Sequence, residues 1–220
     1  MDVVHLELGD PLYPSALRIF FSDHPPKAIA IMGNLDILRQ KKLALFCSVK
    51  CPGTLILQTY DLARTLRAAG VTVISGFHSP MEKECLTLLL RGTQPVIVCP
   101  ARSIDRMRLP TEWKAPLAEG RLLLLSPFAE KLHRVTTDLA QRRNEFVAVL
   151  ADKVFVAHAA PGSKTGRFCR DVLAWGKPLL TLDSEENVHL LALGAKPLRP
   201  ESVGTQRRMN AGQAAEEGSE

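Results

Sequence analysis

Short apolar segments alternate with amphipathic segments through most of this chain, and this alternation restricts the fold more than any other feature. The apolar segments are four or five residues long, which suits strands buried on both faces. The segments between them carry apolar residues at helical spacing, as at Leu55, Leu62 and Leu66. Strands that alternate with helices through short turns form βαβ units. We therefore predict an α/β fold, a Rossmann-like open parallel sheet with helices on both faces.

The limits of these segments follow from turn and cap residues. Thr54 is the expected N-cap of the first core helix, and Ser79 followed by Pro80 marks the start of the second. Gly70 and Gly92 end the same two helices. The expected strands span 28–32, 43–47, 71–74, 95–99, 121–125, 154–158 and 178–182. The expected helices span 55–69, 79–91, 111–119, 130–150 (as one helix or two pieces), 164–175 and 185–193.

The 220 residues fit one ordinary domain with a short appendage. We expect residues 1–40 to be a lead-in packed on the core, 41–196 to be the Rossmann-like domain, and 197–220 to be a disordered tail, because the apolar period is lost there. No apolar run approaches the length of about 20 residues that crosses a bilayer. The first residues show no signal-peptide pattern either. The expectation is a cytoplasmic protein with no membrane partner.

Charge and cysteine content narrow the class of partner only slightly. A formal charge of +5 is compatible with a nucleic-acid or nucleotide partner and does not require one. The cysteines number five, and an odd count without a secretory signal argues against a disulfide framework. Cys47 and Cys51 are not followed by a second ligand pair at zinc spacing. We expect reduced, buried cysteines and no metal.

Several short motifs occur in the order in which one known family carries them. They are Tyr13-Pro14-Ser15-Ala16-Leu17 (YPxxL), Asp23-His24-Pro25-Pro26 with Gly33-Asn34 (PPxxLxxxGN), Ser75-Gly76 (SGxAxGID), Arg143-Asn144 with the apolar residues after it (RNRIIAGLSDxVVVVEA), Gly162-Ser163 (SGS) and Trp175-Gly176-Lys177-Pro178. On these motifs the chain resembles the DprA/Smf DNA-processing family over about residues 10–183. Their order is more persuasive than any one of them.

The resemblance implies a non-enzymatic protein that binds single-stranded DNA and helps to load a RecA-type recombinase. The DNA would lie in a basic pocket at the C-terminal ends of the strands, where backbone N–H groups and helix N-termini favour phosphate. Homodimers occur in that family. No cofactor is implied. The residues expected to contact nucleic acid or phosphate are Ser48, Lys50, Ser75, Gly76, Arg143, Asn144, Gly162, Ser163 and Lys164.

The sequence also departs from the family pattern. Residues 47–49 stand where the family has its GSR loop, and only Lys50 follows as a cation. The SGxAxGID loop keeps its first two residues, 75–76, and the glutamate that ends a later strand is replaced by His158. We expect no winged-helix domain, which many members carry, within these 220 residues. The fold is therefore expected to follow the family more closely than the DNA site does.

Each candidate motif also has a purely structural interpretation. Arg143 and Asn144, with Arg142 and Arg134, form either a cationic edge or a solvated helix face. The loop 161–166 either cradles a phosphate or only caps a helix. His78 is either a phosphate contact or base, or a surface histidine. Phe77 either stacks on a base or packs in the core.

Catalytic signatures are missing from the sequence. It contains no HExxH, no GxSxG elbow, no GxGxxG fingerprint and no evident pair of carboxylates. The loop 161–166 is only a faint echo of the PGGxGTxxE loop of nucleotide phosphoribohydrolases. Two further hypotheses stay open. One is a nucleotide-binding sensor or nucleoside-phosphate hydrolase that uses His158 or His78, and the other is a protein–protein module that has lost its ligand.

Overall fold

Strand β3 (Lys42–Phe46) lies at the centre of the parallel part of the sheet and is buried along its whole length. Leu43 and Leu45 pack into one apolar cluster, whereas Ala44 and Phe46 pack into the cluster on the opposite face. Successive side chains of a strand point to opposite faces, so a strand covered on both sides needs an uninterrupted apolar run. This requirement explains why the core strands are recognisable in the sequence.

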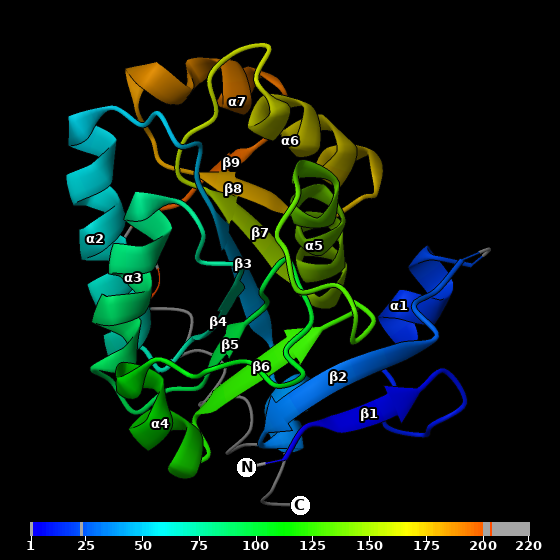
Figure 1. The fold of residues 1–220 in the computed structure, drawn as a ribbon. Helices are drawn as coiled ribbons and strands as arrows, with labels where there is room; N and C mark the ends of the chain where they lie inside the picture. Colours follow the sequence, from blue (N-terminus) through cyan, green and yellow to red (C-terminus); the bar gives the residue numbers. More distant parts are fainter. Residues whose placement is uncertain (1, 23, 200–202, 204–220) are drawn as a thin grey trace, which may run out of the picture.

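The computed structural model describes residues 2–22, 24–199 and 203. Nine strands form one sheet in the order β1-β2-β6-β5-β4-β3-β7-β8-β9 (Figure 1). The seven strands from β6 to β9 run parallel, and β1 and β2 extend the sheet in antiparallel fashion beyond β6. The predicted α/β, Rossmann-like fold is confirmed, with an antiparallel edge that the sequence did not indicate.

The strands are β1 (Val4–Glu7), β2 (Ala28–Gly33), β3 (Lys42–Phe46), β4 (Thr72–Ser75), β5 (Val96–Val98), β6 (Leu122–Ser126), β7 (Lys153–Val156), β8 (Leu179–Thr181) and β9 (Lys196–Pro197). The α-helices are α1 (Ser15–Phe20), α2 (Gly53–Ala68), α3 (Pro80–Leu90), α4 (Thr111–Ala118), α5 (Thr137–Leu150), α6 (Lys164–Ala174) and α7 (Val188–Ala192). Two 3₁₀-helices, η1 (Leu35–Arg39) and η2 (Glu185–Asn187), complete the described elements.

Helices cover both faces of the sheet, as Figure 1 shows. Helices α2, α3 and α4 pack on one face, where Leu62, Cys85 and Leu117 belong to the same apolar cluster. Helices α1, α5 and α6 cover the other face through the cluster that contains Leu17 and Phe146. The two faces together bury nearly all of the predicted apolar segments.

The order of the strands reverses between β3 and β7. The chain leaves β3 through α2 on one face and leaves β7 through α6 on the other, so the loops that follow these two strands diverge. In open α/β sheets this reversal opens a crevice at the C-terminal ends of the strands, and ligands bind there. The loops at this edge span residues 47–52, 76–79, 99–110, 127–136, 157–163 and 182–184.

Two predicted helix starts were wrong. The helix expected over 130–150 begins at Thr137, because the Thr136 side chain accepts a hydrogen bond from the Leu139 backbone N–H and the preceding residues are mostly exposed. Thr54 is not an N-cap, since α2 already begins at Gly53. The Thr54 hydroxyl instead donates to Glu186 Oε1 at 3.1 Å.

Segments on both sides of the expected core domain join the sheet. Strands β1 and β2 come from the expected lead-in, and β9 pairs with β8 where the expected tail begins. The rest of that tail, apart from 198, 199 and 203, lies outside the described residues. Within the described part of the chain, every helix falls short of the length and apolar character that a membrane span requires.

Candidate nucleic-acid interface

Arg143 is a buried cation at the C-terminal edge of the sheet. Its side chain leaves α5 and reaches the end of β5, where Nη1 donates to the Cys99 carbonyl at 3.1 Å and Nε donates to Asn144 Oδ1 at 2.8 Å. Only 5% of the residue is exposed. Burial lowers the pKa of Arg143 below its usual value, partly offset by Glu82 and Cys99. Among the described residues no carboxylate lies within ion-pair distance of the guanidinium, although Glu82 acts on it electrostatically.

Gly76 leaves room for the Arg143 side chain because it has no side chain of its own. A Cβ atom on Gly76 would lie 1.3 Å from Arg143 Nη1 and 1.9 Å from Cζ, which is inside the guanidinium group. Any side chain at position 76 would therefore displace Arg143. The glycine that we predicted as a phosphate contact thus has a definite structural task, the close approach of a cation to the end of β4.

The Ser75 hydroxyl makes its hydrogen bonds within the protein. It donates to the Leu45 carbonyl at 2.6 Å and accepts from the Phe77 backbone N–H at 3.2 Å. The residue has no exposed surface. A ligand cannot reach this side chain, so Ser75 shapes the loop after β4 and is not among the contacts proposed below.

Glu82 connects the first two loops of this edge. Oε1 accepts from the Cys47 backbone N–H at 2.9 Å, and Oε2 accepts from the N–H groups of His78 at 2.8 Å and Ser79 at 3.2 Å. Ser79 Oγ in turn accepts from the Glu82 N–H and completes a capping box at the start of α3. The Glu82 carboxylate therefore accepts hydrogen bonds from backbone N–H groups near the end of β3, and these N–H groups are not free to bind a phosphate.

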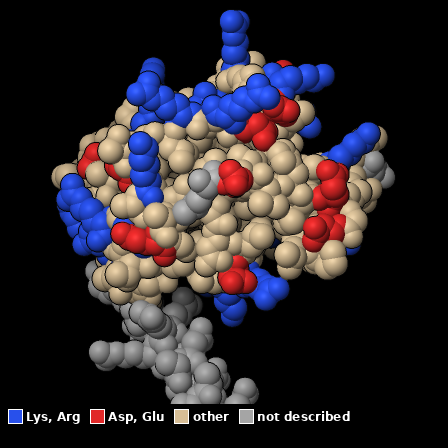
Figure 2. Space-filling view, turned by 60° about the horizontal axis from the view of Figure 1, so that its bottom comes forward, with Lys and Arg blue, Asp and Glu red and all other residues tan. Residues whose placement is uncertain are grey.

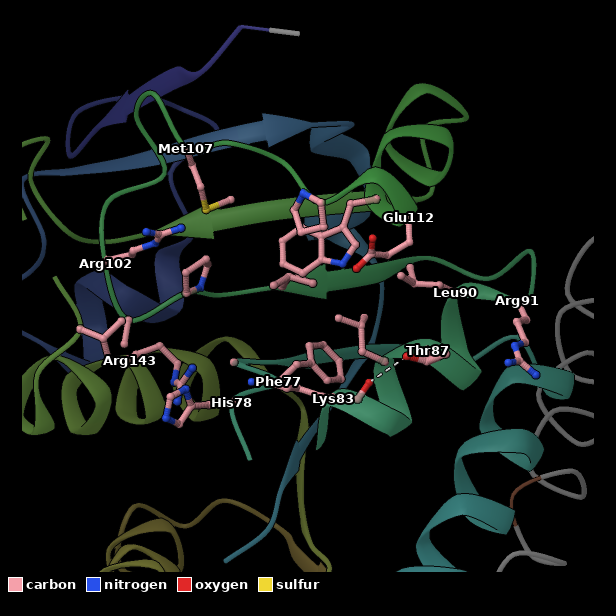
Figure 3. A pocket seen from close by; sticks show the side chains of 18 residues that line it. Phe77, His78, Lys83, Thr87, Leu90, Arg91, Arg102, Met107, Glu112 and Arg143 are labelled. Carbon is pink, nitrogen blue, oxygen red and sulfur yellow. Dashed lines mark hydrogen bonds between the residues drawn. The ribbon is translucent and has the colours of Figure 1, made fainter. Parts of the chain in front are cut away.

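A cavity of about 750 Å³ extends from Arg143 along α3. Figure 3 shows Arg143 and His78 at one end of it and Glu112 and Arg91 towards the other. The basic side chains in its wall are His78, Lys83, Arg91, Arg102 and Arg143, and the only acidic one among the described residues is Glu112. The local balance of charge is therefore strongly positive.

The crevice between β3 and β7 contains a hydrogen-bonded pair of polar side chains, His158 and Asn187. The Asn187 amide nitrogen donates to the Ala157 and Leu182 carbonyls, which turns Asn187 Oδ1 toward His158 Nδ1 at 3.0 Å. His158 Nδ1 is therefore the donor in this hydrogen bond. Ser48 Oγ, on the neighbouring loop, is buried and has no hydrogen-bond partner among the described residues.

The remaining predicted contacts lie along α5 and α6 or on exposed loops. Asn144 and Lys164 line a groove of about 430 Å³ between these helices. Ser163 caps α6 by accepting from the Gly166 N–H at 3.0 Å. Gly162 adopts a left-handed backbone with φ of +71° and is exposed, as is Lys50. The structure thus distributes the predicted residues over several places along this edge. Arg143 contacts two other members of the set, Gly76 and Asn144.

Surface charge alone does not locate the site. Figure 2 shows one face of the molecule, with Lys and Arg side chains gathered mainly along its upper and left rims and a broad uncharged surface between scattered Asp and Glu. Because the net charge is modest, the position of individual cations matters more than the total.

Comparison with known proteins connects this geometry to a family. Residues 5–215 match the family described as DNA recombination-mediator protein A. The chain belongs to that family. The resemblance inferred from the order of the motifs is thereby confirmed, and the match includes the sheet except for the first residue of β1.

Solved structures show how widely the fold of the DNA recombination-mediator protein A family is shared. The chain is similar to DNA processing protein A (DprA) of Streptococcus pneumoniae, with a TM-score of 0.73 and 20% identity over 90% of this chain and 71% of that one. It is also similar to DNA processing protein A of Helicobacter pylori, described for its single-stranded DNA binding mode, with a TM-score of 0.76 and 22% identity over 94% and 97% of the two chains.

A molybdenum cofactor binding protein of Rippkaea orientalis is a more distant structural neighbour, with a TM-score of 0.51 and 13% identity over 80% of this chain and 98% of that one. No curated protein sequence matches the chain. At these identities the structural likeness shows the shared fold.

In this member of the DNA recombination-mediator protein A family, sequence reasoning missed three residues of the candidate site. Glu82 could have been found from the Ser79-x-x-Glu82 spacing, which is the signature of a capping box. Arg102 and Trp113 carried no signal, because they belong to a loop and a helix that meet Arg143 only in the folded chain.

Proposed function

We propose that the chain binds single-stranded DNA through phosphate contacts centred on Arg143. The observation that carries this proposal is a buried arginine, 5% exposed as a residue, that makes no ion pair in the described part of the chain and lies at the edge where α/β sheets bind ligands. A buried cation is costly unless an anion compensates it. Membership of a DNA-processing family makes a nucleic-acid phosphate the anion that fits best.

The other predicted contacts are proposed as a second set around Arg143. Asn144 holds the Arg143 Nε and faces the groove that also contains Lys164. Lys50 and Gly162, which are exposed, and Ser163, which is half-buried, extend the set along the same edge of the sheet. Ser48 is included because it lies on the same loop as Lys50 and its buried hydroxyl lacks a partner among the described residues. A strand laid across these loops would meet several cations.

The protein is expected to bind DNA without catalysing a reaction, and the affinity is expected to depend strongly on salt. Each phosphate neutralised by a Lys or Arg releases counterions, so the affinity falls as salt rises. Because Arg143 would meet the backbone and not the bases, its loss should weaken all sequences alike. The same pocket would serve the alternative function, a sensor or hydrolase for a small nucleotide, and the experiment below separates the two.

Fluorescence anisotropy of a labelled single-stranded oligonucleotide, measured at about 50 and 200 mM salt, tests the proposal. The parent protein should bind, and Arg143→Ala should bind more weakly with a salt slope lower by about 1. Arg39→Ala is the matched control, because Arg39 is an exposed arginine in η1, before the start of β3 and away from this edge. Equal binding by parent and Arg143→Ala would refute the proposal, and stabilisation by mononucleotides without oligonucleotide binding would favour the alternative.

Two partners expected from the family resemblance are further proposals. A recombination-mediator role would bring the chain to a RecA-type recombinase, and a homodimer would place two Arg143 sites on one particle. Co-elution with a RecA-type protein on single-stranded DNA, and the mass from light scattering, test these separately.

A further inference from the structure

The cavity next to Arg143 has the dimensions of a ligand site. Its volume of about 750 Å³ lies within the usual range for small-molecule pockets, about 300–1,000 Å³. One wall is the face of α3 with Lys83 and Thr87, and the facing wall is the loop 99–110 with Met107 (Figure 3). Gly76, His78 and Arg143 form one end. The segment 76–91, the segment 98–113 and Arg143 of α5 thus enclose one space.

Aromatic and other apolar side chains line the middle of this cavity. Trp113 of α4 and Met107 are partly exposed to it, and Phe77 is buried beside them. Phe77 also has a left-handed backbone with φ of +45°, which is uncommon for a residue with a bulky side chain. The hydrogen bonds from the Phe77 N–H to Ser75 and from the His78 N–H to Glu82 hold that conformation. An indole ring, a thioether and a phenyl ring suit a flat, polarisable ligand.

The charges around the cavity suit an anionic ligand. Lys83, Arg91, Arg102 and Arg143 make no ion pair with any carboxylate of the described residues, although all four line the wall. Arg143 uses two of its five N–H groups in hydrogen bonds within the protein. The site therefore combines a cationic end with an apolar, aromatic middle, which is the composition that a base joined to a phosphate requires.

We propose that this cavity holds one nucleobase, stacked against Trp113, while the adjoining phosphate lies on Arg143. The inference rests on the proposed function, since it assigns the phosphate to the same arginine. It goes further in assigning a base-binding role to Trp113, Phe77 and Met107. The base belongs either to a bound DNA strand or to a free nucleotide.

The test compares two ligands of equal charge. One is a short single-stranded oligonucleotide, and the other is an abasic strand of the same length with the same number of phosphates. Trp113→Ala should weaken binding of the normal strand about 5- to 150-fold, the range that corresponds to about 1–3 kcal/mol per stacked base, and leave the abasic strand unaffected. Arg143→Ala should weaken both. Trp113→Leu gives the same comparison if Trp113→Ala does not fold, because it keeps an apolar side chain without a ring.

A second arm identifies the source of the base. Trp175 packs against Phe20 on the opposite face of the sheet, so Trp175→Phe leaves Trp113 as the only indole and hence the only reporter. Quenching of Trp113 fluorescence by a deoxynucleoside monophosphate assigns the cavity to a free nucleotide, and quenching by the oligonucleotide alone assigns it to a strand.

The outcomes that overturn the inference differ from those that overturn the proposed function. If the parent binds both strands and Trp113→Ala weakens both equally or neither, the base site is wrong while the phosphate site stands. If the parent binds neither strand and no nucleotide quenches Trp113, the proposed function and the base site both fail.

Discussion

Replacing Gly76 by alanine should disable the site without touching any ligand directly. The added methyl group would lie 1.3 Å from Arg143 Nη1, so the guanidinium must leave its place at the end of β5. Gly76 does not have a left-handed backbone, and the main chain itself therefore accepts alanine. The whole effect of Gly76→Ala should pass through the arginine.

The magnitude follows from what the displaced guanidinium loses. A hydrogen bond from a charged donor, such as that from Arg143 to the Cys99 carbonyl, contributes about 1.5–3 kcal/mol. Replacing glycine by alanine also stabilises the folded state by about 0.4–1 kcal/mol, because it lowers the conformational entropy of the unfolded chain. We expect a net loss of about 1–2 kcal/mol in the free energy of unfolding, or about 2–8 °C in Tm for a domain of this size. Loss of one charged phosphate contact should weaken oligonucleotide binding about 10- to 150-fold.

A double-mutant cycle tests the reasoning. Thermal unfolding by circular dichroism and oligonucleotide anisotropy are measured for the parent, Gly76→Ala, Arg143→Ala and the double variant. If Gly76 acts through Arg143, the double variant should bind no worse than either single variant, and Gly76→Ala should cost no stability once Arg143 is absent. Additive losses of binding would refute this account, because they would mean that Gly76 contributes independently of the arginine.

The surroundings of the site give three other predictions. Glu82→Gln should lower the free energy of unfolding by about 3 kcal/mol, since an amide NH₂ would face backbone donors, whereas Glu84→Gln, an exposed neighbour on α3, should leave the melting temperature unchanged. Iodoacetamide should modify Cys51 first in the native protein, because a hydrogen bond from the Cys47 thiol lowers the pKa of Cys51, and Cys47→Ala should slow that reaction; preferential labelling of another cysteine would contradict it. Burial acts to raise the pKa of Asp105, but hydrogen bonds from Ser103 and His5 outweigh it and the net pKa is lowered, so its contribution to stability is present above about pH 4 and is lost as the pH falls. Asp105→Asn should therefore lower the Tm at pH 7 by more than at pH 3, and an equal deficit at both would count against the assignment.

The sequence by itself determined the elements and the family. The core strands are continuous apolar runs because both faces of the sheet are covered, and such runs are visible without any partner. The starts of α3 and α6 were also visible in the sequence, because the N-cap residues Ser79 and Ser163 each bond within the first turn of their own helix. Arg143 and Gly76 were marked by the order of short motifs. All of these signals are local in the chain.

Tertiary structure decided the order of the strands, the antiparallel edge and the construction of the site. Periodicity reports that a side chain is buried and says nothing of what covers it, so the passage of Arg143 over Gly76 and the reach of Glu82 to Cys47 were beyond prediction. The cavity with Trp113 shows the same limit on a larger scale, because its walls come from segments that meet only when the sheet has formed. Local sequence sets the conformation of each segment, whereas a ligand site depends on contacts between segments.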